Sequence, residues 1–242
     1  MLIKKIYKPL LLLSLVFQGC NDFEDLNTNP NEPTAVSSGV LFSSAIRNSA
    51  QTQSNESFLL GNNIAQLSAK TIRAEVDFYG WNAFPTVWEG FYESLTDVQQ
   101  VIDISVETGD TATQAAAVIY KSWIYSVLTN AYGDIPYSEA MKGLEANFTP
   151  AYDSQEAIYA DLLNSLQQAV GMLSNGGNVQ GDLLFEGDTQ KWVQFANSLQ
   201  LRLLMYQSNK QDVSAAFASI VNSGNIINSN ENQAAVTFLS SF

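Results

Sequence analysis

The stretch that most constrains this chain is an apolar segment that begins at Thr111 and reads TATQAAAVIYKSWIYSVLTNAYGDIPYSEAM. Its apolar residues recur every three to four positions, and the face they form is wide enough to be buried on two sides of a helix. These residues are Ala116, Ile119, Tyr120, Trp123, Ile124, Val127 and Leu128. Gly133 stands where a left-handed helix cap is favoured, and Pro136 prevents the helix from continuing. The sequence therefore predicts a central helix that ends at a locally specified turn.

Further stretches with helical spacing lie on both sides of this segment. The predicted helices are Val36–Gln51, Phe58–Ile72, one that begins at Pro85, one that follows a capping-box-like Asp153-Ser154-Gln155-Glu156, Gln190–Gln207 with Asp188 as its cap, and Val213–Asn222. Val40 and Leu67 are among the apolar positions expected to pack, and Ala234–Phe242 reads as a strand. We expect a mostly α fold with little β structure, in which helical hairpins of uneven period each bury a face on the next.

Composition excludes several classes of function. The chain has 242 residues, of which 46% are hydrophobic, so it can bury a large core. Its 24 acidic residues outnumber 11 basic ones, and the basic residues of the body are scattered singly, which argues against nucleic-acid binding. The absence of histidine removes the usual general base near neutral pH and the commonest zinc ligand. A single cysteine excludes an internal disulfide.

The N-terminus has the features of an exported lipoprotein. Three lysines precede the apolar run Leu10–Phe17, which is far shorter than the ~20 residues of a membrane-spanning helix. Gly19-Cys20 resembles a bacterial lipobox, so we expect a signal peptide over residues 1–19 and lipidation of Cys20. The alternative is a cleaved signal with an incidental cysteine. Residues 20–34 are predicted to be a tether, and residues 35–242 a helical domain.

An aromatic stretch supplies the candidate ligand-binding residues. Trp88, with the apolar residues that follow it on one helical face, is predicted to belong to the core. Tyr79, Trp81 and Asn82 precede that helix and need not be buried. An exposed aromatic ring can stack on the C–H face of a sugar, and an asparagine can bridge two hydroxyls. The alternative is a loop that turns these aromatic side chains inward.

Two groups of acidic residues are weaker candidates. Glu89, Glu93 and Asp97 fall on one helical face, where two carboxylates could cleave glycosides or hold calcium. A solvated face explains them better. Asp182, Glu186 and Asp188 could offer oxygen ligands, although helix capping is the simpler role for Asp188. We predict no catalytic residue, no metal site and no cofactor.

Several segments together resemble the SusD/RagB family of Bacteroidetes outer-membrane lipoproteins, in particular its SusD-like nutrient-binding branch. They are Cys20 followed by NDFEDLNTNPNEPT, VWEGFYESLTDVQQVID from Val87, YGDIPYSEA from Tyr132, YDSQEAIYADLLNSL from Tyr152, and DLLFEGDTQKWVQFANSLQLRLLM from Asp182. Their order and spacing make the set specific. The resemblance implies an irregular tetratricopeptide-like helical-hairpin scaffold.

The same resemblance implies a function. Such proteins are anchored in the outer membrane by the N-terminal lipid, face the cell exterior, and capture oligosaccharides or other nutrients. They hand the ligand to a SusC-like TonB-dependent transporter. The family has no catalytic residue to carry over, and its binding aromatics vary, so only Tyr79, Trp81 and Asn82 are placed, by position.

The sequence leaves two alternative functions open. The chain could be a helical scaffold that covers the transporter without binding a small ligand, or, with less support, a glycan-cleaving enzyme that uses the acidic row. The chain is also shorter than members of the family, and we expect it to be an N-terminal fragment that lacks the C-terminal part.

Overall fold

A computed structural model describes residues 36–72, 74–80 and 85–238, and most of these residues are helical. Its helices are α3 (Ser38–Glu56), α4 (Asn62–Ile64), α5 (Pro85–Thr108), α6 (Thr111–Tyr132), α7 (Gln155–Leu173), α8 (Thr189–Gln207) and α9 (Ser214–Asn222), with a π-helical turn η1 (Ser57–Gly61) and the 3-10 turns η2 (Gly143–Glu145) and η3 (Asn230–Asn232). Strand β1 (Ile135–Pro136) pairs antiparallel with β2 (Tyr152–Asp153). The predicted fold class is confirmed.

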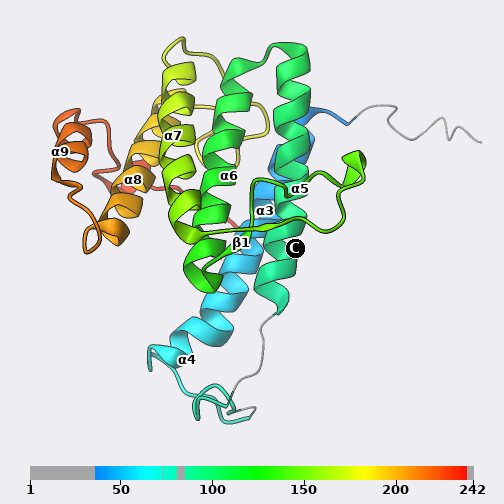
Figure 1. The fold of residues 1–242 in the computed structure, drawn as a ribbon, viewed down its shortest axis with the longest axis vertical. Helices are drawn as coiled ribbons and strands as arrows, with labels where there is room; N and C mark the ends of the chain where they lie inside the picture. The colour runs from blue at the N-terminus through cyan, green and yellow to red at the C-terminus, as the bar shows by residue number, and fades with distance from the viewer. Residues whose placement is uncertain (1–35, 73, 81–84, 239–242) are drawn as a thin grey trace, which may run out of the picture. The chain divides into compact units, whose positions relative to one another are not determined.

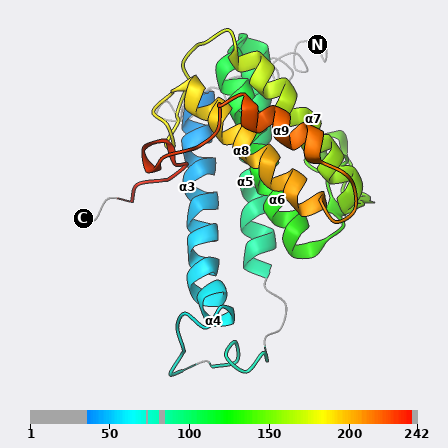
Figure 2. The same cartoon turned by 90° about the vertical axis from the view of Figure 1, so that its left-hand side faces the viewer.

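The centre of the helical body is α6, as the sequence predicts. It packs against α3, α5, α7 and α8, and the successive pairs α5–α6, α6–α7 and α7–α8 form the expected hairpins (Figures 1 and 2). Buried side chains occur around most of its circumference, including Ala115, Ile119, Ile124 and Leu128, each at 0% exposure. A helix that is apolar on all sides can be accommodated only in the interior, which explains its position.

Both ends of α6 are specified locally. The Asp110 side chain accepts a hydrogen bond from the Thr113 amide (3.1 Å), which is the usual contribution of an N-cap. At the other end, Gly133 has φ +77° and donates from its amide to Thr129 (2.9 Å). This backbone conformation favours glycine, and the turn leads directly into Ile135 and Pro136 of β1.

The core that joins the first and last long helices is built around Trp192, which is fully buried. Its indole stacks on Phe42 of α3 with ring centroids 5.8 Å apart, and Phe185 meets it edge-on at 5.3 Å. The indole N–H donates to Asp182 (2.8 Å). Asp182 also accepts from the backbone amides of Leu184, Phe185 and Gly187, so both of its oxygens serve the loop before α8. This arrangement leaves Asp182 a structural group.

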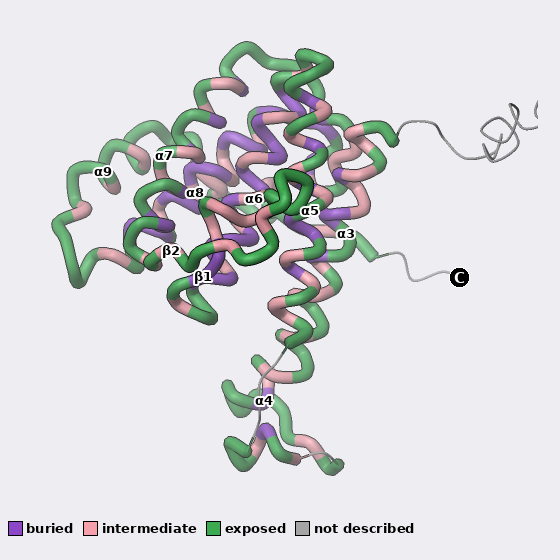
Figure 3. The backbone as a smooth tube through the Cα atoms, turned by 45° about the vertical axis from the view of Figure 1, so that its right-hand side comes forward, coloured by how far each residue is buried: buried purple, intermediate pink, exposed green. Residues whose placement is uncertain are grey.

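The predicted helix Phe58–Ile72 is confirmed as helical only to Ile64 and is wrong beyond that residue. The helical path ends at Ala65 after η1 and the three residues of α4, and Gln66 has φ +56°. The Asn63 side chain donates to the Leu59 carbonyl (2.8 Å) and accepts from Ser68 (3.2 Å), which are contacts that compete with regular helix geometry. Leu67 is exposed, so no packing stabilises a longer helix. Figure 3 shows the segment around α4 mostly in the colour of exposed residues.

Three smaller expectations also need correction. The N-cap of α7 is Ser154, which accepts from Ala157, because Asp153 is occupied by the turn after β1. Val40 is exposed, since α3 buries Phe42, Ala45, Ile46 and Ser49 instead. Residues 234–238 form no strand, and Val236 packs against the core as a single side chain. None of the helices within the described ranges has the length and apolar character needed to cross a membrane.

Candidate functional site

The segment between α4 and α5 carries the residues for which the sequence predicts sugar binding. Within residues 65–72 and 74–80, Val76 is the only buried side chain. The chain turns around it, with the Gly80 amide donating to Glu75 (2.7 Å) and the Tyr79 amide to Val76 (3.1 Å). These turns direct Phe78 and Tyr79 outward, where they are 81% and 63% exposed.

Tyr79 adopts an unusual backbone conformation. Its φ is +56°, in the left-handed region that costs a non-glycine residue roughly 1–2 kcal/mol. Such strain is more frequent at functional sites than elsewhere. The loop therefore holds this aromatic ring in a position that the backbone alone would not favour.

The same segment surrounds a hollow of about 640 Å³, within the size range of small-ligand sites. It is lined by Asn63, Gln66, Leu67, Ser68, Ala69, Lys70, Ala74, Asp77, Phe78 and Tyr79. The Asp77 carboxylate accepts from the Lys70 amide (3.0 Å) and so ties the two sides of the hollow together. Aromatic rings beside amide, hydroxyl and charged groups match what a sugar offers.

Of the three predicted ligand residues, the structure places Tyr79 in the lining of this hollow. Trp81 and Asn82 lie outside the described residues, as does Cys20. Their roles stay predictions.

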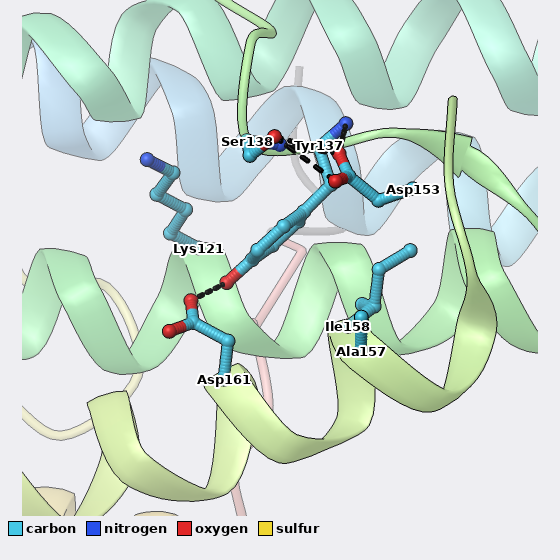
Figure 4. A pocket seen from close by; sticks show the side chains of 7 residues that line it. All are labelled: Lys121, Tyr137, Ser138, Asp153, Ala157, Ile158 and Asp161. Carbon is cyan, nitrogen blue, oxygen red and sulfur yellow. Dashed lines mark hydrogen bonds between the residues drawn. The ribbon is translucent and has the colours of Figure 1, made fainter. Parts of the chain in front are cut away.

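A second hollow, which the sequence did not reveal, lies between α6, α7 and the turn after β1 (Figure 4). Its volume is about 490 Å³, and it is lined by Lys121, Tyr137, Ser138, Asp153, Ala157, Ile158 and Asp161. A smaller hollow of about 220 Å³ shares Lys121, Tyr137 and Asp161 with it and is lined also by Gln99, Ile102, Val118, Ser122, Tyr125, Leu162 and Ser165. We call the two hollows together the Lys121 pocket.

Hydrogen bonds to β2 and α7 fix the turn after β1, which forms one side of the Lys121 pocket. Asp153 accepts from the backbone amides of Tyr137 (3.2 Å) and Ser138 (2.8 Å), so the turn after β1 is fixed over α7. The Tyr137 phenol then reaches down and donates to Asp161 (2.5 Å), as Figure 4 shows. Burial, and next the Asp161 carboxylate, raise the pKa of Tyr137, so its phenol remains a donor at neutral pH.

Lys121 places a half-buried cation beside both hollows. Its ammonium donates to the side-chain oxygen of Gln99 (2.7 Å) and lies 5.9 Å from the centre of the Tyr125 ring. Burial lowers the pKa of Lys121, whereas the nearby Asp103 and Asp161 act in the opposite direction. Across the described residues, the Gln99 oxygen is the one hydrogen-bond acceptor of this ammonium.

Tyr125 leaves a polar group without a partner in the same place. The residue is 1% exposed, and its hydroxyl has no hydrogen-bond partner among the described residues. Burial raises the pKa of Tyr125, followed by the effects of Tyr92 and Asp153. A buried hydroxyl without a partner is uncommon in folded proteins and calls for an explanation.

The acidic row on α5 is arranged as the sequence suggested. Glu89 and Glu93 are exposed, and Asp97 is half-buried. Glu93 and Asp97 border a shallow hollow of about 410 Å³ whose other lining side chains are neutral: Asn48, Thr52, Ser94 and Thr96. Burial, and next Glu93, raise the pKa of Asp97. Glu89, Glu93 and Asp97 thus form a solvated acidic face of α5, within one helical turn of the core residues of the same helix.

One signal could have revealed the Lys121 pocket. Lys121 is the only charged residue between Thr111 and Tyr132, in a helix that is otherwise apolar or weakly polar. A lone cation in a central helix needs acceptors. Its neighbours Tyr137 and Asp161 are distant in sequence, so the spacing alone could not identify them.

Comparison with known proteins gives one family. Residues 30–241 match the model of the SusD-like family described as starch-binding and associating with the outer membrane. No curated protein matches the chain.

Several solved structures are similar. A SusD homologue from Bacteroides fragilis superposes with a TM-score of 0.70 at 23% identity, over 86% of this chain and 45% of its own. A SusD homologue from Bacteroides uniformis has a TM-score of 0.62 at 28% identity, over 83% and 46%. A chitin-binding protein has a TM-score of 0.63 at 28% identity, over 81% and 44%. The chain thus spans less than half the length of these structures.

Proposed function

Because the chain belongs to the SusD-like family of starch-binding proteins that associate with the outer membrane, we propose that it captures an oligosaccharide at the cell surface and delivers it to a SusC-like TonB-dependent transporter. The capture step is supported by the exposed segment between α4 and α5, which we call the aromatic loop. Its residues Phe78 and Tyr79 are exposed and line a hollow of ligand size. Delivery to the transporter rests on the family resemblance.

In this proposal Tyr79, Trp81 and Asn82 bind the sugar. Tyr79 already borders the hollow, and Trp81 and Asn82 follow it by two and three positions in the chain. Aromatic rings would stack on the apolar face of a pyranose, while Asn82 and the polar groups of the hollow would bind its hydroxyls. The proposed activity is non-covalent binding, in which no covalent bond is made or broken.

The site is tested by alanine substitution in the complete protein. We expect Trp81→Ala and Tyr79→Ala each to weaken binding of maltoheptaose or chitohexaose about tenfold or more, because a stacking surface is lost. Isothermal titration calorimetry measures the change. Tyr206→Ala serves as the control, since Tyr206 is a comparably exposed tyrosine on α8.

Two results would count against this proposal in different ways. If the parent binds an oligosaccharide and both variants bind it equally well, the residues are wrong. If the parent binds none yet copurifies with a barrel transporter, the helical scaffold reading replaces nutrient capture.

The membrane anchor is the second part of the proposal. We expect Cys20→Ser to move the protein from the outer-membrane fraction to the soluble fraction, because the thiol is the proposed attachment point of the acyl chains. Labelling with a palmitate analogue and mass measurement of the extracted protein check this. Label that persists in Cys20→Ser would refute lipidation at this residue. If the anchored parent protein resists protease added outside intact cells, it is anchored in the membrane but does not face the exterior.

A further inference from the structure

A fifth hollow lies between α3, α6 and α8, and residues 234–238, in red beside α3 in Figure 2, form one of its sides. Its volume is about 400 Å³. The residues that line it are Ala50, Gln53, Ser54, Tyr120, Trp123, Leu184, Phe195, Arg202, Ala234, Val236 and Phe238. We call this hollow the Arg202 cleft. It shares no lining residue with the Lys121 pocket or with the hollow of the aromatic loop.

Apolar side chains form most of the walls of the Arg202 cleft, and they keep surface that a ligand can contact. Four of them pack against the core and are only partly buried: Trp123, Leu184, Phe195 and Val236. Phe238 is 57% exposed. Water against such walls is displaced favourably by the C–H groups of a ligand, because apolar surface then leaves contact with water on both sides. The cleft therefore favours a molecule with an apolar body.

The polar group that remains available in the cleft is the guanidinium of Arg202. Two other polar side chains of the lining are engaged within the protein: the Tyr120 hydroxyl is hydrogen-bonded to Ser49 (2.6 Å), and the Gln53 amide donates to Ser57 (3.0 Å). Arg202 is exposed, and none of the described residues accepts a hydrogen bond from it or forms an ion pair with it. Arginine stays positively charged in proteins and offers five donors in a planar fork.

Charge distinguishes the Arg202 cleft from the other hollows. Each of the other four is lined by at least one carboxylate, whereas the described residues contribute none to this cleft. The carboxylates of the others belong to Asp77, Glu93, Asp97, Asp153 and Asp161. An anion that entered the Arg202 cleft would thus meet a guanidinium and no acid, and a carboxylate could accept two parallel hydrogen bonds from it. A cation would meet only repulsion.

We propose that the Arg202 cleft binds a small apolar monocarboxylate, such as a medium-chain fatty acid or an arylalkanoic acid. Arg202 holds the carboxylate, and the alkyl chain or ring lies against Trp123 and Phe195. The volume of the cleft is within the range of small-ligand sites. This binding does not depend on sugar capture by the aromatic loop, so either proposal can fail without the other.

Three probes of the same shape test the preference for an anion. In the complete protein, we expect isothermal titration calorimetry to give a dissociation constant of roughly 0.1 mM for phenylbutyrate. Phenylbutanol has the same ring and chain without the charge and should bind about tenfold more weakly, because it loses the paired hydrogen bonds to the guanidinium. Phenylbutylamine should bind more weakly still, since its ammonium faces Arg202.

Substitutions test the role of the arginine. Arg202→Gln should weaken phenylbutyrate binding about tenfold and leave phenylbutanol binding unchanged, because only the acid uses the charge. Arg202→Lys keeps the charge but not the planar fork, so its affinity for the acid should lie between those of the parent and Arg202→Gln. Arg47→Gln is the matched control, since Arg47 is an exposed arginine on α3 that lines none of the five hollows.

Tryptophan fluorescence locates the apolar part of the ligand. A terminally brominated octanoate should quench the fluorescence of the parent, because its bromine comes into contact with the indole of Trp123 in the cleft. Trp123→Phe should remove most of this quenching. Trp88→Phe should not, since Trp88 lies among Tyr92, Tyr132 and Tyr152 and lines none of the five hollows.

Three outcomes would overturn the proposal. Equal affinity of phenylbutyrate for the parent and for Arg202→Gln would show that the guanidinium does not hold the carboxylate. Quenching that persists in full in Trp123→Phe would place the brominated acid outside the cleft. An absence of binding by both acids at millimolar concentration would show that the cleft takes no apolar monocarboxylate, whatever sugar the aromatic loop binds.

Discussion

Replacing Asp182 with alanine is expected to lower the free energy of unfolding by about 4 kcal/mol. The carboxylate accepts from the backbone amides of Leu184 (2.8 Å), Phe185 (3.1 Å) and Gly187 (3.0 Å). It also accepts from the indole of Trp192 (2.8 Å), which is fully buried. Alanine would leave these donors without a partner, and the indole N–H could reach water only if the core opened. Chemical denaturation followed by tryptophan fluorescence measures the loss.

Two companion variants make this test specific. Glu186→Ala removes an exposed acid from the same loop and should change stability little. Asp182→Asn keeps one oxygen as an acceptor and should fall between the parent and Asp182→Ala. If Asp182→Ala unfolds at the same denaturant concentration as Glu186→Ala, the hydrogen bonds of the carboxylate are not what holds the loop to Trp192.

Replacing Gly181 with alanine is expected to destabilise the fold by about 3 kcal/mol or more. A Cβ at this position would overlap the backbone of Gly39 in α3, with its Cα only 2.6 Å away. Gly181 also has φ +68°, and its carbonyl accepts from the Ser43 hydroxyl (2.8 Å). Because backbone atoms cannot move aside as a flexible side chain does, the loop must separate from α3 to admit the methyl group. Thermal unfolding by circular dichroism measures the cost.

Gly176 provides the control for Gly181. It lies in the same loop with φ +74°, but a Cβ there would meet open space. Gly176→Ala should therefore cost only the roughly 1–2 kcal/mol of the left-handed backbone conformation. The difference between the two variants isolates the close approach to α3. Equal melting temperatures for both would mean that the contact between the loop and α3 contributes nothing to stability.

The helices and their ends were the part of the fold that could be predicted from the sequence. Helix α6 followed from its apolar spacing and from Gly133, and the cap of α8 followed from Asp188, which accepts from the amides of Gln190 and Lys191. These signals are local, because each involves residues within one or two turns of the chain. The family resemblance added the arrangement of the hairpins.

Features that depend on contacts between residues far apart in the sequence could not be predicted. Asp182 looked like a possible oxygen ligand, and its hydrogen bond from the buried Trp192 indole became evident only in the structure. The Lys121 pocket brings together positions as far apart as Gln99 and Ser165, so no window of sequence contains it. The second half of the predicted helix Phe58–Ile72 had suitable periodicity, but it lacked a partner to pack against.

The aromatic loop is attached to the helical body in a way that bears on how such proteins diversify. In its described part, residues 65–72 and 74–80, Val76 alone is buried, and the Trp192 core shares no side chain with it. Substitutions, insertions or deletions in the loop would thus leave the bundle's stability nearly unchanged. The surface positions of this loop can then change without a compensating change in the interior.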